Sequence, residues 1–285
     1  MSKRRDIEEH VKILDEIKGI MSAMKNLALM ESHKLSRVLE TQHRAVSDIE
    51  AAGQDFVAFH PTLKPDASGK ELYLVIGAER GFCGDFNTRL LSTLDQHLQT
   101  TDNREPVLVI VGRKVWERAE RLYRIAAAVE GPTVSEDVQV VLLRVIDQLR
   151  EVAARQRYGG RAPVTAVYHD GVTESVVVRP LRPFQSPSSP RARSERAFPP
   201  LLTLPPTVFF SQLIDLYLFS LLHAIFYSAL MAESRARLAH LESSIRRLER
   251  DQTALLRRRN VLRQEEITEE IEMLMLSTFV TPRRR

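Results

Sequence analysis

A seven-residue apolar repeat at each end of the chain constrains its fold more than any other feature of the sequence. Near the N-terminus the repeat comprises Ile7, Leu14, Met21, Ala28, Leu35, Gln42, Ile49 and Phe56, and Gln42 is its one polar member. The C-terminal repeat comprises Leu241, Leu248, Leu255 and Leu262, interleaved with Leu238 and Ile245. Apolar residues that return about every 3.5 positions need a partner helix. We therefore expect two long terminal helices that pair with each other, an arrangement better suited to transmitting force than to enclosing a substrate.

Composition places the chain among folded, soluble proteins. Apolar residues make up 44% and charged residues 27% of the 285 residues, and the net charge of +4 permits but does not require an anionic partner. The single cysteine, Cys83, excludes an internal disulfide and suits a reducing compartment. The first ten residues lack the apolar core of a secretory signal. The uncharged stretch Leu216–Ala232 is at the lower limit for a membrane span, and we expect a helix buried by protein.

The middle of the chain alternates predicted strands and helices, which favours a partly parallel α/β sheet. The expected strands are 71–79, 106–112, 163–171 and 174–184, with Asp170-Gly171 as the turn of a hairpin between the last two. Three helices are expected. The first is capped by Asp85 or Asn87 and ends near Gln99, and the others cover 113–126 and 135–157. The chain thus divides into an N-terminal helix (1–60), a central α/β domain (61–184), a Pro/Arg-rich loop (185–206) and a C-terminal helix (207–285).

Motifs that bind nucleotides or metals do not occur in the sequence. Neither a G-x-x-x-x-G-K-[ST] phosphate loop nor a G-x-G-x-x-G turn follows a predicted strand, and the eight histidines show no metal-ligand spacing. We read the Gly81-Phe82-Cys83-Gly84 turn as a tight connection and Cys83 as a poor candidate nucleophile. The arginine cluster around Arg257–Arg259 is followed by the acidic run 265–272, which would repel a phosphate backbone. The sequence therefore predicts no cofactor, no metal, no direct nucleotide binding and no nucleic-acid partner.

Three segments, in order, resemble the gamma subunit of F-type ATP synthases, the central rotor shaft. Ile20–Ala28, with the sequence IMSAMKNLA, is similar to the family's I-T-x-A-M-K-M-V-A. Glu79–Asn87, with the sequence ERGFCGDFN, is similar to D-R-G-L-C-G-x-L-N. Asn260–Ile271, with the sequence NVLRQEEITEEI, is similar to Y-N-x-x-R-Q-x-x-I-T-x-E-I. The resemblance covers both helices and the first strand, and it consists of little more than layout from Arg113 to about Pro206.

The resemblance implies a fold and a set of partners. The terminal helices would form an antiparallel coiled coil beside a central Rossmann-like α/β domain. The chain would be a non-catalytic subunit that contacts the alpha and beta subunits of the F1 hexamer, the epsilon subunit and the c-ring of the membrane sector. It would be a peripheral protein on the cytoplasmic face of a bacterial inner membrane, and its rotation would couple ion flow to ATP synthesis or hydrolysis. The positions that match family contacts with the catalytic-subunit loop and the sleeve of the hexamer are Met24, Lys25, Arg237, Arg263, Gln264 and Thr268.

Several departures from the family pattern mark the chain as a divergent member. Asn26-Leu27 replaces Met-Val, Asp85 replaces a common glycine, and Arg259 replaces the tyrosine before Asn260. The alternatives are an antiparallel coiled-coil adaptor, a nucleic-acid-binding module without a rotary role, and an enzyme that binds a nucleotide in the α/β domain. The sequence leaves open the coupling ion, proton or sodium, the main direction of the reaction, and whether the complex is a main or an auxiliary ATPase.

Overall fold

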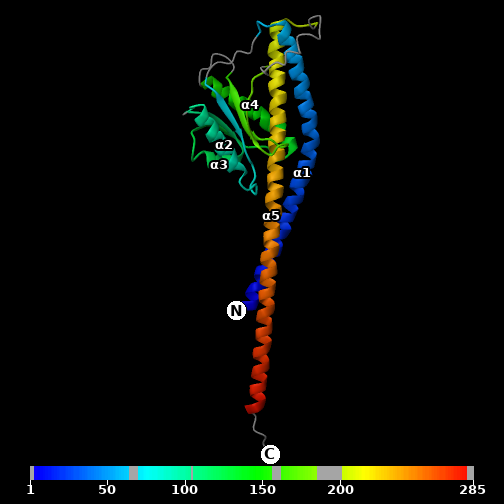
Figure 1. The fold of residues 1–285 in the computed structure, drawn as a ribbon, viewed down its shortest axis with the longest axis vertical. Helices are drawn as coiled ribbons and strands as arrows, with labels where there is room; N and C mark the ends of the chain where they lie inside the picture. The colour runs from blue at the N-terminus through cyan, green and yellow to red at the C-terminus, as the bar shows by residue number, and fades with distance from the viewer. Residues whose placement is uncertain (1–2, 64–69, 104, 156–161, 185–200, 281–285) are drawn as a thin grey trace, which may run out of the picture. The chain divides into compact units, whose positions relative to one another are not determined.

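The computed structural model describes residues 3–63, 70–103, 105–155, 162–184 and 201–280. The chain forms two compact units. The helical unit comprises Met1–Leu27 and Ala239–Arg285, and the α/β unit comprises Ala28–Leu238. Two long helices, α1 (Lys3–Phe59) and α5 (Pro206–Val280), each contribute residues to both units (Figure 1). The predicted four-segment division stays a prediction, and residues 185–200 of its loop lie outside the described residues.

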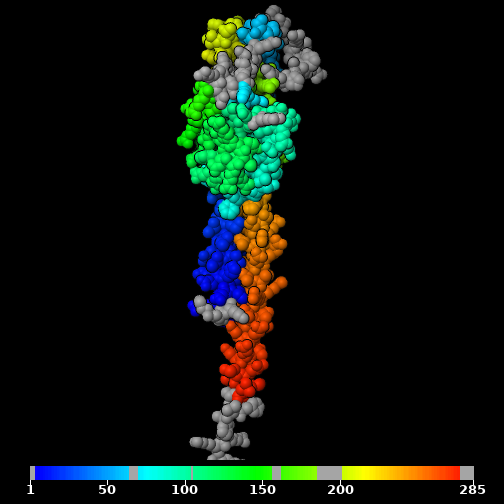
Figure 2. All heavy atoms as spheres, turned by 90° about the vertical axis from the view of Figure 1, so that its left-hand side faces the viewer, coloured from blue at the N-terminus to red at the C-terminus, as the bar shows by residue number. Residues whose placement is uncertain are grey.

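In the helical unit α1 and α5 run antiparallel. Three ion pairs fix this direction, because residue numbers rise along α1 as they fall along α5: Arg4–Glu266 at 3.5 Å, Lys18–Glu249 at 3.4 Å and Lys25–Glu242 at 4.0 Å. Figure 2 shows the two segments side by side, in blue and orange. All three pairs are at least partly solvated, so they set the direction of pairing more than they stabilise it. The antiparallel pairing expected of the two terminal helices is confirmed.

The apolar repeat lies on the buried face of these helices, but the burial is one-sided. Ile7, Met21 and Leu241 are buried, whereas Ile17, which belongs to the second apolar series of α1, is 40% exposed. Neighbouring apolar residues on the same side of α1 are exposed as well; they are Ile13, Ile20 and Leu27. The pairing with α5 therefore covers one apolar series and leaves a second stripe of α1 open to solvent.

The α/β unit contains a five-stranded sheet with the order β3-β2-β1-β4-β5. The strands are β1 (Leu72–Ile76), β2 (Val107–Val111), β3 (Ile125–Val129), β4 (Val164–His169) and β5 (Val176–Pro180). β1 to β4 are parallel to one another, and β5 pairs antiparallel with β4, so the predicted hairpin is confirmed. The connecting helices are α2 (Phe86–Thr100), α3 (Arg113–Ala119) and α4 (Val138–Arg155), the last preceded by a 3-10 turn at Ser135–Asp137.

Alternate side chains of the central strands enter two cores, which explains why these strands read as continuous apolar runs. Leu72, Leu74 and Ile76 of β1 join the larger core, formed with α1, α4 and α5. Tyr73 and Val75 point the other way, into the core formed with α2 and α3. Figure 1 shows α2 and α3 together on one side of the sheet, with α4 toward the long helices. The sheet is thus held between α2 and α3 on one face and α4 with the two long helices on the other.

One predicted helix is wrong in extent, and a second is confirmed over its described residues. The helix expected over 113–126 ends at Ala119, and Ile125–Val129 forms β3, a strand that the sequence analysis missed. Its sequence, IAAAV, contains three alanines, which have little strand propensity, and its parallel pairing with β2 decides its conformation. The helix expected over 135–157 begins as the 3-10 turn and is α-helical from Val138 to Arg155, beyond which the residues are not described.

The uncharged stretch of α5 is a buried core helix in the α/β unit. Of the described helices, α5 alone has the length and composition of a membrane span, and 61% of its most apolar window is buried within the protein. Leu221, Ile225 and Phe226 are each about 1% exposed. The expected burial of this stretch by protein is therefore confirmed.

We predict that Leu35→Ala lowers the free energy of unfolding by about 2–5 kcal/mol, because Leu35 is fully buried and its truncation leaves a cavity in the larger core. Urea denaturation of the full chain measures the change. Ile20→Ala is the matched control on α1: this side chain is 63% exposed, and its loss should cost less than about 0.5 kcal/mol. Equal effects of the two substitutions would contradict the one-sided burial of α1.

Candidate functional site

Residues 228–237 of α5 face two loops at the carboxyl ends of β1 and β4 in the α/β unit. The strand order reverses between these two strands, since β2 and β3 lie on one side of β1 and β4 and β5 on the other. In open α/β sheets the crevice outside the carboxyl ends of the strands at such a reversal is the usual ligand site. Here the protein's own side chains enter this region, and their contacts define the candidate site.

A buried carboxylate on α5 holds the loop that follows β1. The Glu233 carboxylate accepts hydrogen bonds from the backbone N–H groups of Glu79 and Arg80, each at 3.2 Å, and it pairs with the Arg237 guanidinium one turn further along α5. Arg237 Nε also donates to the carbonyl oxygen of Gly81, at 3.3 Å. Glu233 is 4% and Arg237 7% exposed. We call Glu79, Glu233 and Arg237 the clasp, because together they fix the loop against α5.

Glu79, the member of the clasp that lies on the loop after β1, extends the connection across the sheet. The Glu79 carboxylate accepts the backbone N–H of Arg113, at the start of α3, at 2.9 Å, and that of Gly131, just after β3, at 2.8 Å. The Arg113 guanidinium lies 3.5 Å from the same carboxylate. Through Glu233 and Glu79, α5 is therefore linked by hydrogen bonds to the carboxyl ends of β1, β2 and β3.

The turn between β4 and β5 is held by the preceding part of α5. Ser228 Oγ donates to Asp170 Oδ1 and accepts the N–H of Gly171, both at 2.8 Å. Arg235 donates to the Gly171 carbonyl oxygen at 2.5 Å and lies 3.6 Å from the Glu174 carboxylate. A Cβ at position 171 would lie 2.7 Å from the Ser228 carbonyl oxygen, so this approach requires glycine. The loops after β1 and β4, the two strands between which the strand order reverses, are thus both bound to residues 228–237 of α5.

Burial shifts the pKa of titratable groups in and beside the clasp. Burial raises the pKa of the Cys83 thiol to about 12, and the Glu233 charge adds to the effect. Burial lowers the pKa of His169, which favours the neutral ring; its Nε2 lies 2.9 Å from the Phe86 carbonyl oxygen and can donate to it. Burial also raises the pKa of Glu233, against the opposing effect of Arg237 and the two N–H donors. A thiol with so high a pKa supports the prediction that Cys83 is not a nucleophile.

The described residues contain no group of histidine, cysteine and carboxylate side chains arranged to hold a metal ion. The region where a nucleotide phosphate would lie holds two carboxylates, Glu79 and Glu233, which take up the loop N–H groups that a phosphate would need. The arrangement can therefore fix the sheet to the helix, but it offers a poor site for a phosphate.

The predicted partner-contact residues fall into two groups. Met24 and Lys25 are partly exposed on α1 of the helical unit, while Arg263, Gln264 and Thr268 are exposed on α5 of the same unit. The Thr268 hydroxyl donates to the Gln264 carbonyl oxygen at 2.9 Å. Arg237, in contrast, is buried within the clasp of the α/β unit. The structure gives Arg237 an internal role, and its contact with a partner stays a prediction.

Sequence reasoning missed Glu79 and Glu233 as residues of the site. A signal was available for Glu233, because it is the first formal charge after the seventeen uncharged residues 216–232. A charge that ends such a buried run needs a partner within the fold. Glu79 carries no comparable signal, since its hydrogen-bond donors are backbone N–H groups and its ion-pair partner Arg113 is 34 positions away.

Comparisons with known proteins identify the family. A family model described as ATP synthase matches residues 3–274, nearly the whole chain. The chain belongs to the gamma-subunit family of ATP synthases. The ATP synthase gamma chain of Clostridium botulinum (strain Langeland) is 19% identical over 277 residues, which cover 94% of this chain and 95% of that protein.

A second gamma chain matches over a shorter stretch, and a solved structure matches in fold. The gamma chain of Moorella thermoacetica is 29% identical over 119 residues, 40% of this chain, and the match spans only 42% of that protein's length. A chain of the Euglena gracilis mitochondrial ATP synthase rotor has the same fold, with a TM-score of 0.61 at 15% identity, over 93% of this chain and 98% of that one. The identities are low throughout, in agreement with a divergent gamma subunit.

We predict that Glu233→Gln destabilises this gamma subunit by about 3 kcal/mol or more, because it leaves the Arg237 guanidinium buried without its counter-charge. Chemical denaturation measures the loss. Glu249→Gln is the control on the same helix: its ion pair with Lys18 is solvated and should contribute less than about 1 kcal/mol. Adding Arg237→Met to Glu233→Gln should recover part of the stability, and strict additivity of the two losses would argue against the clasp.

We predict that Cys83 reacts with iodoacetamide at pH 8 at least about a hundredfold more slowly in the native chain than in the unfolded chain, whose thiol has an ordinary pKa near 8.5. The same shift makes the native state lose stability as the pH rises from about 8.5 toward 12, since the unfolded chain ionises first. Mass spectrometry of the alkylated protein gives the two rates. Similar rates would mean that Cys83 is not buried as described.

Proposed function

We propose that this chain is the central-stalk rotor of an F-type ATP synthase, which couples rotation of a membrane-embedded ring to conformational cycling of a catalytic hexamer. The observation that carries the proposal is the antiparallel pairing of α1 and α5 in a member of the gamma family. Two paired helices resist twisting and bending better than one. A rotor must transmit torque without deforming, and a helix pair with a single apolar face is a simple way to obtain that stiffness.

In this proposal the chain carries out no covalent chemistry. The crevice where an α/β sheet would bind a nucleotide holds the clasp, and Cys83 is kept as a thiol by burial. ATP would be bound and turned over by the alpha and beta subunits, and this subunit would move them mechanically. The complex would lie at the cytoplasmic face of a bacterial membrane, with this chain attached peripherally through the c-ring and the epsilon subunit.

The proposed contacts with the hexamer lie in the helical unit. Arg263 and Gln264 are exposed on α5, and Met24 and Lys25 are only partly covered on α1. We propose that these side chains meet the moving loop of a catalytic subunit, and that the charged ones among them make solvated contacts that can form and break as the shaft turns. We propose that Thr268 lies in the same contact.

Copurification tests the proposed assembly. The chain is tagged at its N-terminus in its native host, and the proteins that copurify with it from detergent-solubilised membranes are identified. We expect three alpha and three beta subunits for each tagged chain, together with epsilon and the membrane ring. Recovery of the chain alone from the soluble fraction would contradict the rotor and favour an adaptor, and recovery with nucleic acid would favour the binding-module alternative.

We predict that Arg263→Ala lowers ATP-driven ion pumping by the purified complex by on the order of tenfold, relative to the ATP hydrolysed, because it removes a charged contact with the moving catalytic loop. Arg258→Ala is the control, since Arg258 is also exposed on α5 but lies outside the matched positions. Pumping into vesicles and ATP hydrolysis are measured on the same preparation. Unchanged coupling in Arg263→Ala, or an equal loss in Arg258→Ala, would contradict the proposed role of Arg263.

A further inference from the structure

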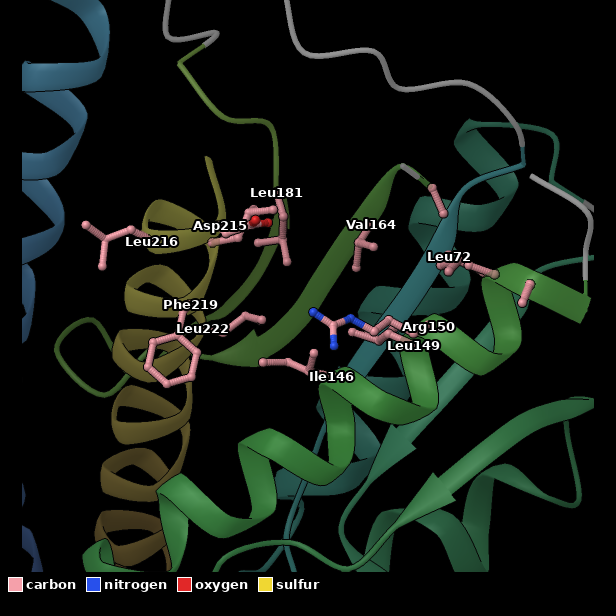
Figure 3. A pocket seen from close by; sticks show the side chains of 14 residues that line it. Leu72, Ile146, Leu149, Arg150, Val164, Leu181, Asp215, Leu216, Phe219 and Leu222 are labelled. Atoms are coloured by element: carbon pink, nitrogen blue, oxygen red, sulfur yellow. The ribbon is translucent and has the colours of Figure 1, made fainter. Parts of the chain in front are cut away.

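A large cavity lies in the α/β unit, at the amino-terminal ends of the strands, whereas the clasp lies at their carboxyl ends. Its volume is about 820 Å³, and it opens between α4 and the first turns of α5, against the first residues of β1 and β4. Figure 3 shows the side chains that enclose it. The lining comes almost entirely from apolar residues, among them Leu72, Leu149, Val164, Phe219 and Leu222. None of the interactions at the carboxyl ends of the strands involves this cavity.

One positively charged side chain of this lining is also exposed to solvent. Arg150 of α4 lines the cavity, and Figure 3 shows its guanidinium directed toward the side where Phe219 and Leu222 lie. No ion pair joins Arg150 to a carboxylate of the described chain. The second charged lining residue, Asp215, lies near Leu181 in the same view, away from the Arg150 guanidinium. The cavity therefore offers an apolar surface and, within reach of it, a cation that has no described counter-charge.

The cavity is partly open to solvent, so a small molecule can enter it from outside the protein. Its volume falls within the range of small-molecule sites, which are mostly apolar and carry one or a few polar groups that orient the ligand. A partner helix fits less well. A helix with its side chains is roughly 11 Å across and rises 5.4 Å per turn, so the cavity would hold only about one and a half turns of it.

We propose that this cavity binds an amphipathic carboxylate of the fatty-acid class. The hydrocarbon tail packs against Leu149, Phe219 and Leu222, where each buried methylene adds to the affinity through the hydrophobic effect. The carboxylate pairs with the Arg150 guanidinium, whose planar fork matches the two carboxylate oxygens. The site is separate from the proposed contacts with the hexamer, and its existence does not depend on the rotor function.

Isothermal titration calorimetry on the purified full chain tests the site with two probes that share a tail, dodecanoate and dodecanol, both kept below the concentrations at which they aggregate. We expect dodecanoate to bind at one site per chain and more tightly than dodecanol. Arg150→Gln should weaken dodecanoate about tenfold and leave dodecanol unchanged, because it removes one charge-assisted hydrogen-bonding partner. Arg144→Gln, at an exposed position of α4 outside the lining, should change neither affinity.

A cavity-filling variant tests the location independently. Ala153 lines the cavity, and Ala153→Phe should abolish the binding of both probes in a chain that still unfolds cooperatively. Arg150 is exposed, so Arg150→Gln is expected to fold and decides the question even if Ala153→Phe does not. The proposal would be overturned if dodecanoate did not bind, or if the two probes bound with equal affinity. It would also be overturned if neither Arg150→Gln nor Ala153→Phe changed the binding.

Discussion

The α/β unit depends on one buried carboxylate. Glu233 is taken out of water in the middle of α5, and that transfer is unfavourable unless its charge and lone pairs are satisfied. Arg237 supplies the counter-charge, and the loop after β1 supplies two N–H donors. The same requirement that stabilises Glu233 therefore orders the loop, and Glu79 on that loop carries the order on to α3 and β3.

This arrangement shows how an α/β sheet can be fixed to a long helix. The region that serves as a ligand crevice in other sheets of this type is taken up by contacts with α5. A helix that is hydrogen-bonded to two loops, and packed by Leu221, Ile225 and Phe226 into the larger core, cannot turn independently of the sheet. In the proposed rotor, torque would pass between the long helices and the globular part, and the clasp would hold the two together.

The sequence predicted the parts of the fold that rest on periodicity. The apolar repeat in α1 and α5 and the apolar runs of β1, β2 and β4 follow directly from burial on one or two faces, and each was placed to within a few residues. β3 could not be predicted, because its alanines carry little preference and its pairing with β2 is long-range. Likewise the clasp joins Glu79 to Glu233 across 154 positions through backbone donors, and no local pattern encodes such a contact.

The candidate contact residues show a different limit. Their assignment rested on motifs shared with the gamma family, and the same motif residue can serve inside the chain or outside it. Arg237 lies in the clasp, whereas Arg263 and Gln264 are exposed. Burial separates these cases, and burial at a helix surface depends on which segments of the fold cover it. The one-sided burial of α1, with Ile20 open and Met21 covered, follows the same rule.

Rotation of the subunit within its complex is the central claim, and single-molecule imaging tests it most directly. Because Cys83 is buried as a thiol, a cysteine introduced at the exposed position 121 by Arg121→Cys would be the reactive site of this chain for a visible probe, with the hexamer fixed to a surface. The account predicts that ATP makes the probe turn in one direction through repeated full revolutions. A probe that only fluctuates about one orientation, while the same complexes hydrolyse ATP, would contradict it.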